Sequence, residues 1–173
     1  MGNAKSSQGN ICGQLFVSDK GFVAFYPMKR QADYFLALKQ FAKDVGMPEV
    51  LVCDPHPAQT KREVRNFCTQ IGTTLKVLEA KTQWANRAEL YIGLMKEAPQ
   101  KDMRSSGSPL VLWDYCMEHM ALISKITAKK LFQLNGTNPH TMTFGTEADI
   151  LNLCHFGWYE WVHFRDVKTA LPY

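Results

Sequence analysis

Two acidic residues stand where a strand and a helix can bring carboxylates together. Asp54 directly follows the apolar run of residues 49–53, and Glu89 lies early in a predicted helix, on the same face as Asn86. In open α/β sheets, ligands bind beyond the carboxyl ends of the strands, where Asp54 stands. Carboxylates bind Mg²⁺ or Mn²⁺, and a pair of such ions can activate water or a hydroxyl for attack on a phosphodiester. Asp54 and Glu89 are therefore candidate metal ligands.

Each of these residues also has an ordinary structural interpretation. Asp54 precedes Pro55, and an Asp-Pro pair readily opens a turn. Glu89 can be a solvated helix residue, and the same holds for Lys96, which lies seven positions later on the same face. His56 either titrates beside Asp54 or is a plain loop histidine.

Composition restricts the class of protein. The chain has 173 residues, of which 46% are apolar and 21% charged, as expected for one globular domain rather than a disordered segment. No run approaches the ~18 apolar residues of a membrane-spanning helix, and the polar residues 1–10 predict no secretory signal. The net charge of +4 permits a polyanionic partner without requiring one.

The five cysteines are widely spaced and odd in number, which predicts free thiols in a reducing, intracellular compartment. Cys116 with His119, and Cys154 with His155, form two short pairs. Neither pair has a second pair at the spacing of a structural zinc site, so zinc binding is not predicted.

Apolar periodicity predicts strands that alternate with helices, in the order β-β-α-β-α-β-α-α, followed by a β-containing tail. This order indicates an α/β domain with a mixed sheet. The first two strands form a hairpin, and the third, which is almost wholly apolar, is expected to be covered on both faces. The predicted strands are residues 11–17, 21–26, 49–53, 73–79 and 158–164, and the predicted helices begin near residues 33, 60, 84 and 108.

Three local signals set element boundaries. Pro27 is expected to end the second strand, because proline cannot donate to the ladder. Thr60 and Glu63 have the spacing of a capping box at a helix start. Pro109 is expected at the first position of the helix that follows it.

Five segments, in the same order along the chain, resemble the integrases of LTR retrotransposons. Residues 83–89, Gln-Trp-Ala-Asn-Arg-Ala-Glu, resemble the family's P-W-Q-N-x-A-E before its last catalytic glutamate. Asp54 lies 35 positions before Glu89, where the family places its second catalytic aspartate. The other matching segments are residues 14–17 with 26–29, residues 46–49, residues 112–116 and residues 156–162.

This resemblance implies a ribonuclease-H-like mixed sheet flanked by helices and a metal site of the D,D-35-E kind. It implies Mg²⁺ or Mn²⁺ on Asp54 and Glu89, with Asn86 and Lys96 as DNA contacts. The family trims DNA ends and joins them to target DNA in the nucleus, so the implied partners are retroelement and target DNA and further copies of the chain. Residues 1–135 would form the catalytic core and residues 136–173 a post-core segment with a short aromatic strand.

The chain departs from the family at the first catalytic carboxylate. The resemblance places that residue before Met1, on a strand that lies between the hairpin and the Asp54 strand in the sheet order 3-2-1-4-5. We therefore expect this central strand to be largely missing, the chain to be inactive as a transferase, and the isolated chain to be marginally stable or prone to aggregation. The gap from Asp54 to Glu89 also holds 34 residues, one fewer than is usual in the family.

Two alternatives belong to other classes. The chain can be a non-catalytic module, derived from an integrase, that binds nucleic acid or protein. It can also be an unrelated α/β protein in which Asp54 and Glu89 never meet.

Overall fold

The computed structural model describes residues 5–79, 87–128, 134–150 and 156–162. Strand β1 (Cys12–Val17) pairs antiparallel with β2 (Val23–Met28), and β3 (Val50–Cys53) pairs parallel with β4 (Thr74–Val77). Within the described residues these pairs form two separate two-stranded sheets. The mixed α/β character predicted from the sequence is confirmed at this level.

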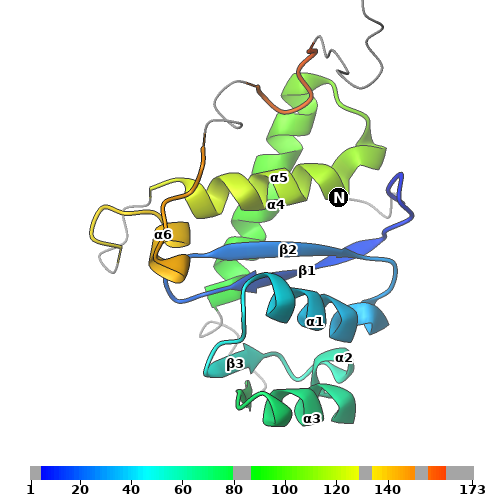
Figure 1. Cartoon of the computed structure of the whole chain (residues 1–173). Coiled ribbons are helices and arrows are strands. Elements are labelled where there is room, and N and C mark those ends of the chain that lie inside the picture. Colours follow the sequence, from blue (N-terminus) through cyan, green and yellow to red (C-terminus); the bar gives the residue numbers. More distant parts are fainter. Residues whose placement is uncertain (1–4, 80–86, 129–133, 151–155, 163–173) are drawn as a thin grey trace, which may run out of the picture.

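Helices cover both faces of the hairpin and one side of the second sheet (Figure 1). Helix α1 packs against one face of β1 and β2, while α4 contacts β1 and α5 contacts β2 on the other face. Helices α2 and α3 lie with β3 and β4 on the far side of α1. The helices are η1 (Gln31–Asp33), α1 (Tyr34–Asp44), α2 (Pro57–Thr60), α3 (Arg62–Gln70), α4 (Arg87–Ser106), η3 (Leu110–Leu112), α5 (Trp113–Ile126) and α6 (Pro139–Phe144).

The hairpin contributes to two apolar clusters because successive residues of a strand point to opposite faces. Phe16 and Ala24 pack with the helix α1 side of the core. Leu15, Val23 and Phe25 pack on the other face, against α4 and α5. Both faces of the hairpin are therefore buried.

The second sheet is buried on one face only. Leu51 and Cys53 are buried, whereas Val50 and Val52 are 49% and 44% exposed. Helix α3 adds the buried Val64 to the same cluster as Leu51. Among the described residues the prediction that residues 49–53 are covered on both faces is therefore wrong, because the described helices pack against the Leu51 face alone.

The structure also corrects the predicted boundary at Pro27. Strand β2 continues through this residue, which lies opposite Gly13. Among the described strands β2 pairs only with β1, so it is an edge strand, where a proline without an N–H is tolerated.

The predicted capping box at Thr60 is not formed. Thr60 ends α2, and its Oγ1 donates a hydrogen bond of 3.2 Å to the carbonyl oxygen of His56. Lys61 is the N-cap of α3 and makes no side-chain capping bond. Since a separate helical turn begins at Pro57, the threonine hydroxyl is used within that turn and not at the start of α3.

Two further boundaries differ from the sequence prediction. Pro109 precedes the short helix η3, and α5 begins only at Trp113. Residues 158 and 159 lie in a turn rather than in the expected aromatic strand, and Tyr159 has a positive φ of 59°. The last two residues of that predicted strand lie outside the described part of the chain. No helix in the described ranges is long and apolar enough to cross a bilayer.

Candidate functional site

Asp54 stands at the carboxyl end of β3, as the sequence predicted. Its side chain is half-buried, and its backbone N–H donates to Oε1 of Gln59 at 3.2 Å. The loop after it is ordered by His56, whose Nδ1 accepts from the N–H of Ala58 at 3.2 Å. His56 is thus the N-cap of α2, which gives this histidine a structural role.

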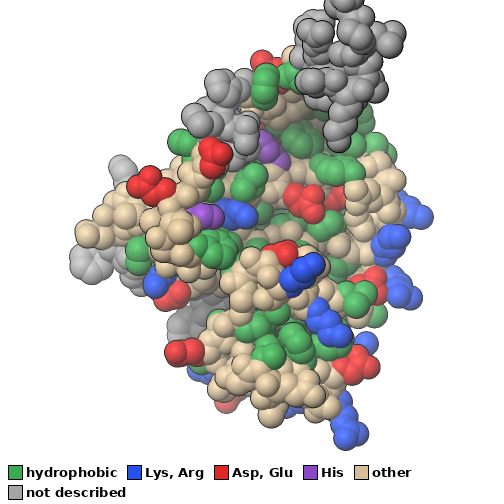
Figure 2. Space-filling model, viewed as in Figure 1, with side chains coloured by type: hydrophobic (Ala, Val, Ile, Leu, Met, Phe, Trp, Pro, Cys, Tyr) green, Lys and Arg blue, Asp and Glu red, His purple; other side chains and the backbone are tan. Residues whose placement is uncertain are grey.

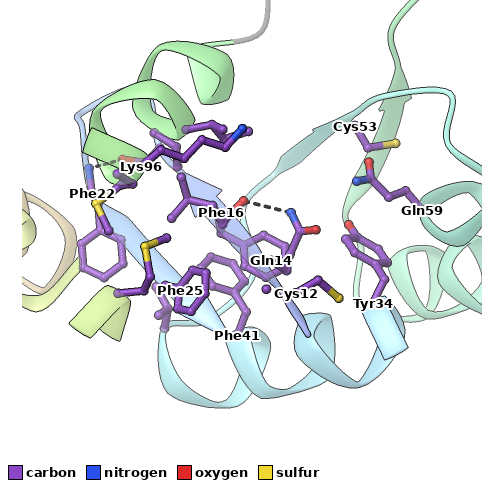
Figure 3. A pocket seen from close by; sticks show the side chains of 18 of the residues that line it. Cys12, Gln14, Phe16, Phe22, Phe25, Tyr34, Phe41, Cys53, Gln59 and Lys96 are labelled. Atoms are coloured by element: carbon purple, nitrogen blue, oxygen red, sulfur yellow. Dashed lines mark hydrogen bonds between the residues drawn. The ribbon is translucent and has the colours of Figure 1, made fainter. Parts of the chain in front are cut away.

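A groove of about 1570 Å³ opens between β1 and β3 (Figure 3). Residues 11–18, which include all of β1, form one wall, and residues 50–54 form the other. Residues of α1 and α4 close its two sides. Pockets for drug-sized ligands have volumes of roughly 300–1,000 Å³, so this groove exceeds the size that a small molecule requires.

Helix α4 presents a polar row to the groove. Lys96, Gln100 and Arg104 follow one another at four-residue spacing, so they share one face of the helix, and all three line the groove. Lys96 and Arg104 are both exposed. Lys96 was predicted from the sequence, whereas Gln100 and Arg104 were not, although their four-residue spacing is visible there.

The other two predicted site residues, Glu89 and Asn86, are not found at the groove in the described part of the chain. Glu89 is exposed in the first turn of α4 and does not line the groove. Asn86 lies outside the described residues. The structure therefore brings Asp54 and Lys96 to one groove and leaves Glu89 two helical turns from Lys96 on α4.

The acidic residues of the described part of the chain do not form a preassembled metal site. Within the described ranges, no three His, Cys, Asp or Glu side chains are grouped so that they could hold a metal ion. Mg²⁺ is commonly bound by one or two carboxylates together with water and substrate phosphates. The described residues therefore do not fit a preassembled two-ion centre, and Asp54 lines the groove without Glu89.

The thiols on the groove walls are poor nucleophiles. Burial raises the pKa of Cys53, the charge of Asp54 raises it further, and Arg65 opposes this shift. Burial also raises the pKa of Cys12, with a further contribution from Asp33. Because the thiolate is the reactive form, these upward shifts lower the reactivity of both thiols at neutral pH.

Charge is mixed on the face of the molecule that Figure 2 shows. On the face shown in Figure 2, Lys and Arg side chains are interspersed with Asp and Glu side chains and with apolar patches. No single basic patch dominates this view. The row on α4 is therefore notable for its position along the groove rather than for the amount of charge it carries.

Comparisons with known proteins identify the fold. No family model and no curated protein sequence matches the chain. The magnesium-bound catalytic core domain of HTLV-2 integrase, in a trimeric form, matches 76% of this chain and 84% of its own with a TM-score of 0.60 and 18% identity.

Two other solved structures of integrases have the same fold. The catalytic core domain of BIV integrase matches 83% of this chain and 90% of its own, with a TM-score of 0.56 and 16% identity. A chain of the simian T-cell lymphotropic virus intasome, solved with the PP2A regulatory subunit B56 gamma, matches 87% of this chain and 54% of its own, with a TM-score of 0.58 and 15% identity. The chain thus shares the fold of retroviral integrase catalytic cores.

Proposed function

We propose that this chain is an integrase-type core, related to those of LTR retrotransposons, that binds DNA without cutting or joining it. The observation that carries this proposal is the placement of Lys96 and Arg104 along a groove that also contains Asp54, in a fold shared with integrase cores. The proposed setting is the nucleus, and the proposed partners are retroelement DNA, target DNA and further copies of the chain.

The row on α4 suits contact with a phosphate backbone. Lys96 and Arg104 are eight positions apart, which is about 12 Å along a helix. Both side chains are exposed, so they can reach phosphates without burial of an unpaired charge. Gln100 lies between them and can donate a neutral hydrogen bond. Such contacts confer affinity that falls with salt and carries little sequence preference.

Asp54 and Glu89 are the residues that we propose as ligands for Mg²⁺ or Mn²⁺, with Asn86 as a supporting DNA contact. A divalent ion held there would stabilise negative charge on a phosphodiester oxygen. Two carboxylates compensate less cation charge than three, and within the described residues no group of three metal-binding side chains is found. This shortage supports the proposal that bound DNA is left intact.

DNA binding is tested by fluorescence anisotropy of a labelled duplex over a series of salt concentrations, in the absence of divalent ions. Lys96→Ala and Arg104→Ala should each weaken binding about fivefold and lower the salt slope by about one. Lys43→Ala, which removes an exposed lysine from α1, is the matched control and should leave both quantities unchanged. Equal losses in all three variants would reject the groove as the DNA site.

Catalysis is tested separately by incubating the chain with labelled duplex and Mg²⁺ or Mn²⁺. We expect no cleavage and no strand transfer by the wild-type chain. Product formation that disappears in Asp54→Asn would contradict the proposed inactivity while supporting Asp54 as a ligand. The DNA-binding assay is independent of this result, because it contains no metal.

A further inference from the structure

An asparagine-glycine pair forms an exposed turn between α5 and α6 in the sequence. Asn135 and Gly136 are both exposed, and their φ angles are positive, at 46° and 80°. The N–H of Thr137 donates to the carbonyl of Leu134 at 2.8 Å and closes a β-turn around the pair. Positive φ at both central residues is characteristic of a type I′ turn, for which Asn-Gly is a preferred sequence.

The two ends of this turn are held in place, while its tip is open. Leu134 is fully buried, and the hydroxyl of Thr137 donates a second bond of 2.7 Å to the Leu134 carbonyl. Pro139, the first residue of α6, is fully buried as well. A Cβ atom at Gly136 would meet nothing within 4 Å. The peptide bond between Asn135 and Gly136 therefore lies beside open space, and the glycine permits it to rotate.

The side-chain amide of Asn135 can react with the backbone nitrogen that follows it. The nitrogen of Gly136 attacks Cγ of Asn135, and the new bond closes a five-membered succinimide ring. The bond from Cγ to Nδ2 breaks, and Nδ2 leaves as ammonia with the proton that the attacking nitrogen has lost. Water then opens the ring at either of its two carbonyl groups. One opening gives aspartate, and the other gives isoaspartate, in which the main chain passes through Cβ and Cγ.

The sequence restricts this reaction to one asparagine. A side chain on the following residue shields the attacking nitrogen, and no asparagine other than Asn135 precedes a glycine. Asn138 precedes a proline, whose nitrogen carries no proton, and its Oδ1 accepts from the N–H of Thr141 at 2.8 Å. Asn66 is exposed but lies within α3, directly before Phe67. Asn66 therefore serves as an internal control for exposure without a following glycine.

The product would alter the connection that holds α6 on the hairpin. Phe144 of α6 packs edge-to-face against the buried Phe22, with ring centroids 5.6 Å apart, and Figure 1 shows α6 beside the end of β2. An isoaspartate at position 135 adds Cβ to the main chain, so the bond from Thr137 to Leu134 can no longer close the same turn. Helix α6 then loses the turn that fixes its start.

We propose that Asn135 is a site of spontaneous deamidation and that its isoaspartate product loosens α6 from the hairpin. The reaction needs only water as a co-reactant and no enzyme. It requires neither DNA nor a metal ion and stands apart from the proposed function.

The experiment follows the full chain during incubation at neutral and at mildly alkaline pH. Peptide mass spectrometry detects the replacement of the side-chain amide by a carboxyl group, and electron-transfer fragmentation separates isoaspartate from aspartate. We expect modification of Asn135 to exceed that of Asn66 by at least about tenfold, a barrier difference of about 1.4 kcal/mol. The rate should rise with pH, because the attacking nitrogen must lose its proton.

Two variants separate the reaction from its consequence. Asn135→Gln should abolish modification at this position, because its longer side chain cannot close a five-membered ring. Asn135→Asp carries the new charge without the longer main chain. Both variants should keep the closed turn and the packing of α6.

Amide hydrogen exchange reports on α6 itself. Within this helix the N–H of Met142 donates to Asn138, and that of Gly145 donates to Thr141. In the isoaspartate fraction, isolated by ion exchange, these two amides should exchange at least about tenfold faster than in fresh protein. Asn135→Asp should exchange like fresh protein.

Three results would overturn the proposal. The first is modification of Asn135 no faster than that of Asn66 in the folded chain. The second is modification of Asn135 only after unfolding in urea, which would show that the turn protects this residue. The third is unchanged exchange of Met142 and Gly145 in the isoaspartate fraction, which would show that α6 does not depend on this turn.

Discussion

The two strand pairs of this molecule differ in how much of each is covered. The hairpin has strands of six residues and is packed by helices on both faces, whereas β3 and β4 have four residues each, and β3 is buried on one face only. Backbone pairing alone does not explain this difference, because both pairs form regular ladders. The hairpin and the second sheet therefore differ in the burial of their side chains and not in the regularity of their strand pairing. We expect the hairpin to be the more stable of the two.

Aromatic packing strengthens the hairpin. The ring of Phe16 stacks on Phe41 with centroids 4.5 Å apart and meets the edge of Tyr26 at 5.8 Å. Aromatic pairs of this kind add roughly 0.5–1.5 kcal/mol beyond the burial of area. Strands β3 and β4 contain no aromatic residue, so local stability should be lower there.

The largest expected difference in the free energy of unfolding is between two truncations, one in each strand pair. Phe16→Ala should lower the free energy of unfolding by about 3–5 kcal/mol, because it removes a buried ring. Val52→Ala should lower it by less than about 1 kcal/mol, since the side chain is 44% exposed. Urea denaturation measures both. Similar costs for the two variants would contradict the contrast between the strand pairs.

A smaller effect is expected at Gly13, which lies under an aromatic ring of the hairpin. A Cβ atom at this position would come within 2.1 Å of Cζ of Phe25, so Gly13→Ala should cost about 1–3 kcal/mol. Gly93→Ala on α4 is the control, because its Cβ meets nothing within 4 Å and alanine favours a helix. Thermal melting should show opposite signs for the two variants. Phe25→Leu should reduce the penalty at Gly13.

The smallest expected effect is a loss of stability at alkaline pH. It is tested by comparing two buried thiols, Cys116 of α5 and Cys53 of β3. Burial raises the pKa of Cys116, which packs against Pro99, from 9.0 to about 12. The folded state then retains a proton that the unfolded chain releases. Stability is therefore complete below pH 9 and falls as pH rises toward 12, by on the order of 1 kcal/mol at pH 10.

Denaturation at a series of pH values measures this loss. Cys116→Ala should flatten the decline between pH 9 and 12. Cys53→Ala is the comparison from β3, where Arg65 partly offsets the effect of burial on the thiol pKa. Cys53→Ala should therefore flatten the decline of stability with pH less than Cys116→Ala does. A profile that neither substitution changes would show that these thiols do not control alkaline stability.

Local patterns in the sequence account for much of the fold. Leu38 and Phe41 mark the buried face of α1, and Val64 and Cys68 mark that of α3, because the 3.6-residue period places them on one side. The hairpin and the strand before Asp54 were also predictable from their apolar runs. These elements depend mainly on residues that are close together in the sequence.

The site depends on contacts between distant segments and was less predictable. Nothing local distinguishes Gln14 and Gln59 from solvated glutamines, yet each bonds to a strand edge on the groove. Arg104 has visible helical spacing from Lys96, but only the packing of α4 shows that this face lines a groove. Thr60 was misassigned because it ends α2, where its hydroxyl donates to the carbonyl of His56, and Lys61 is the N-cap of α3.

The close approach of Gly13 and Phe25 links two positions that are twelve apart in the sequence. The ring occupies the space that a side chain at position 13 would need. We therefore expect the two positions to change together during evolution, with a side chain gained at the first only after the second has become smaller. Homologous sequences should show this order of substitution as correlated change, with glycine retained wherever the aromatic residue is retained.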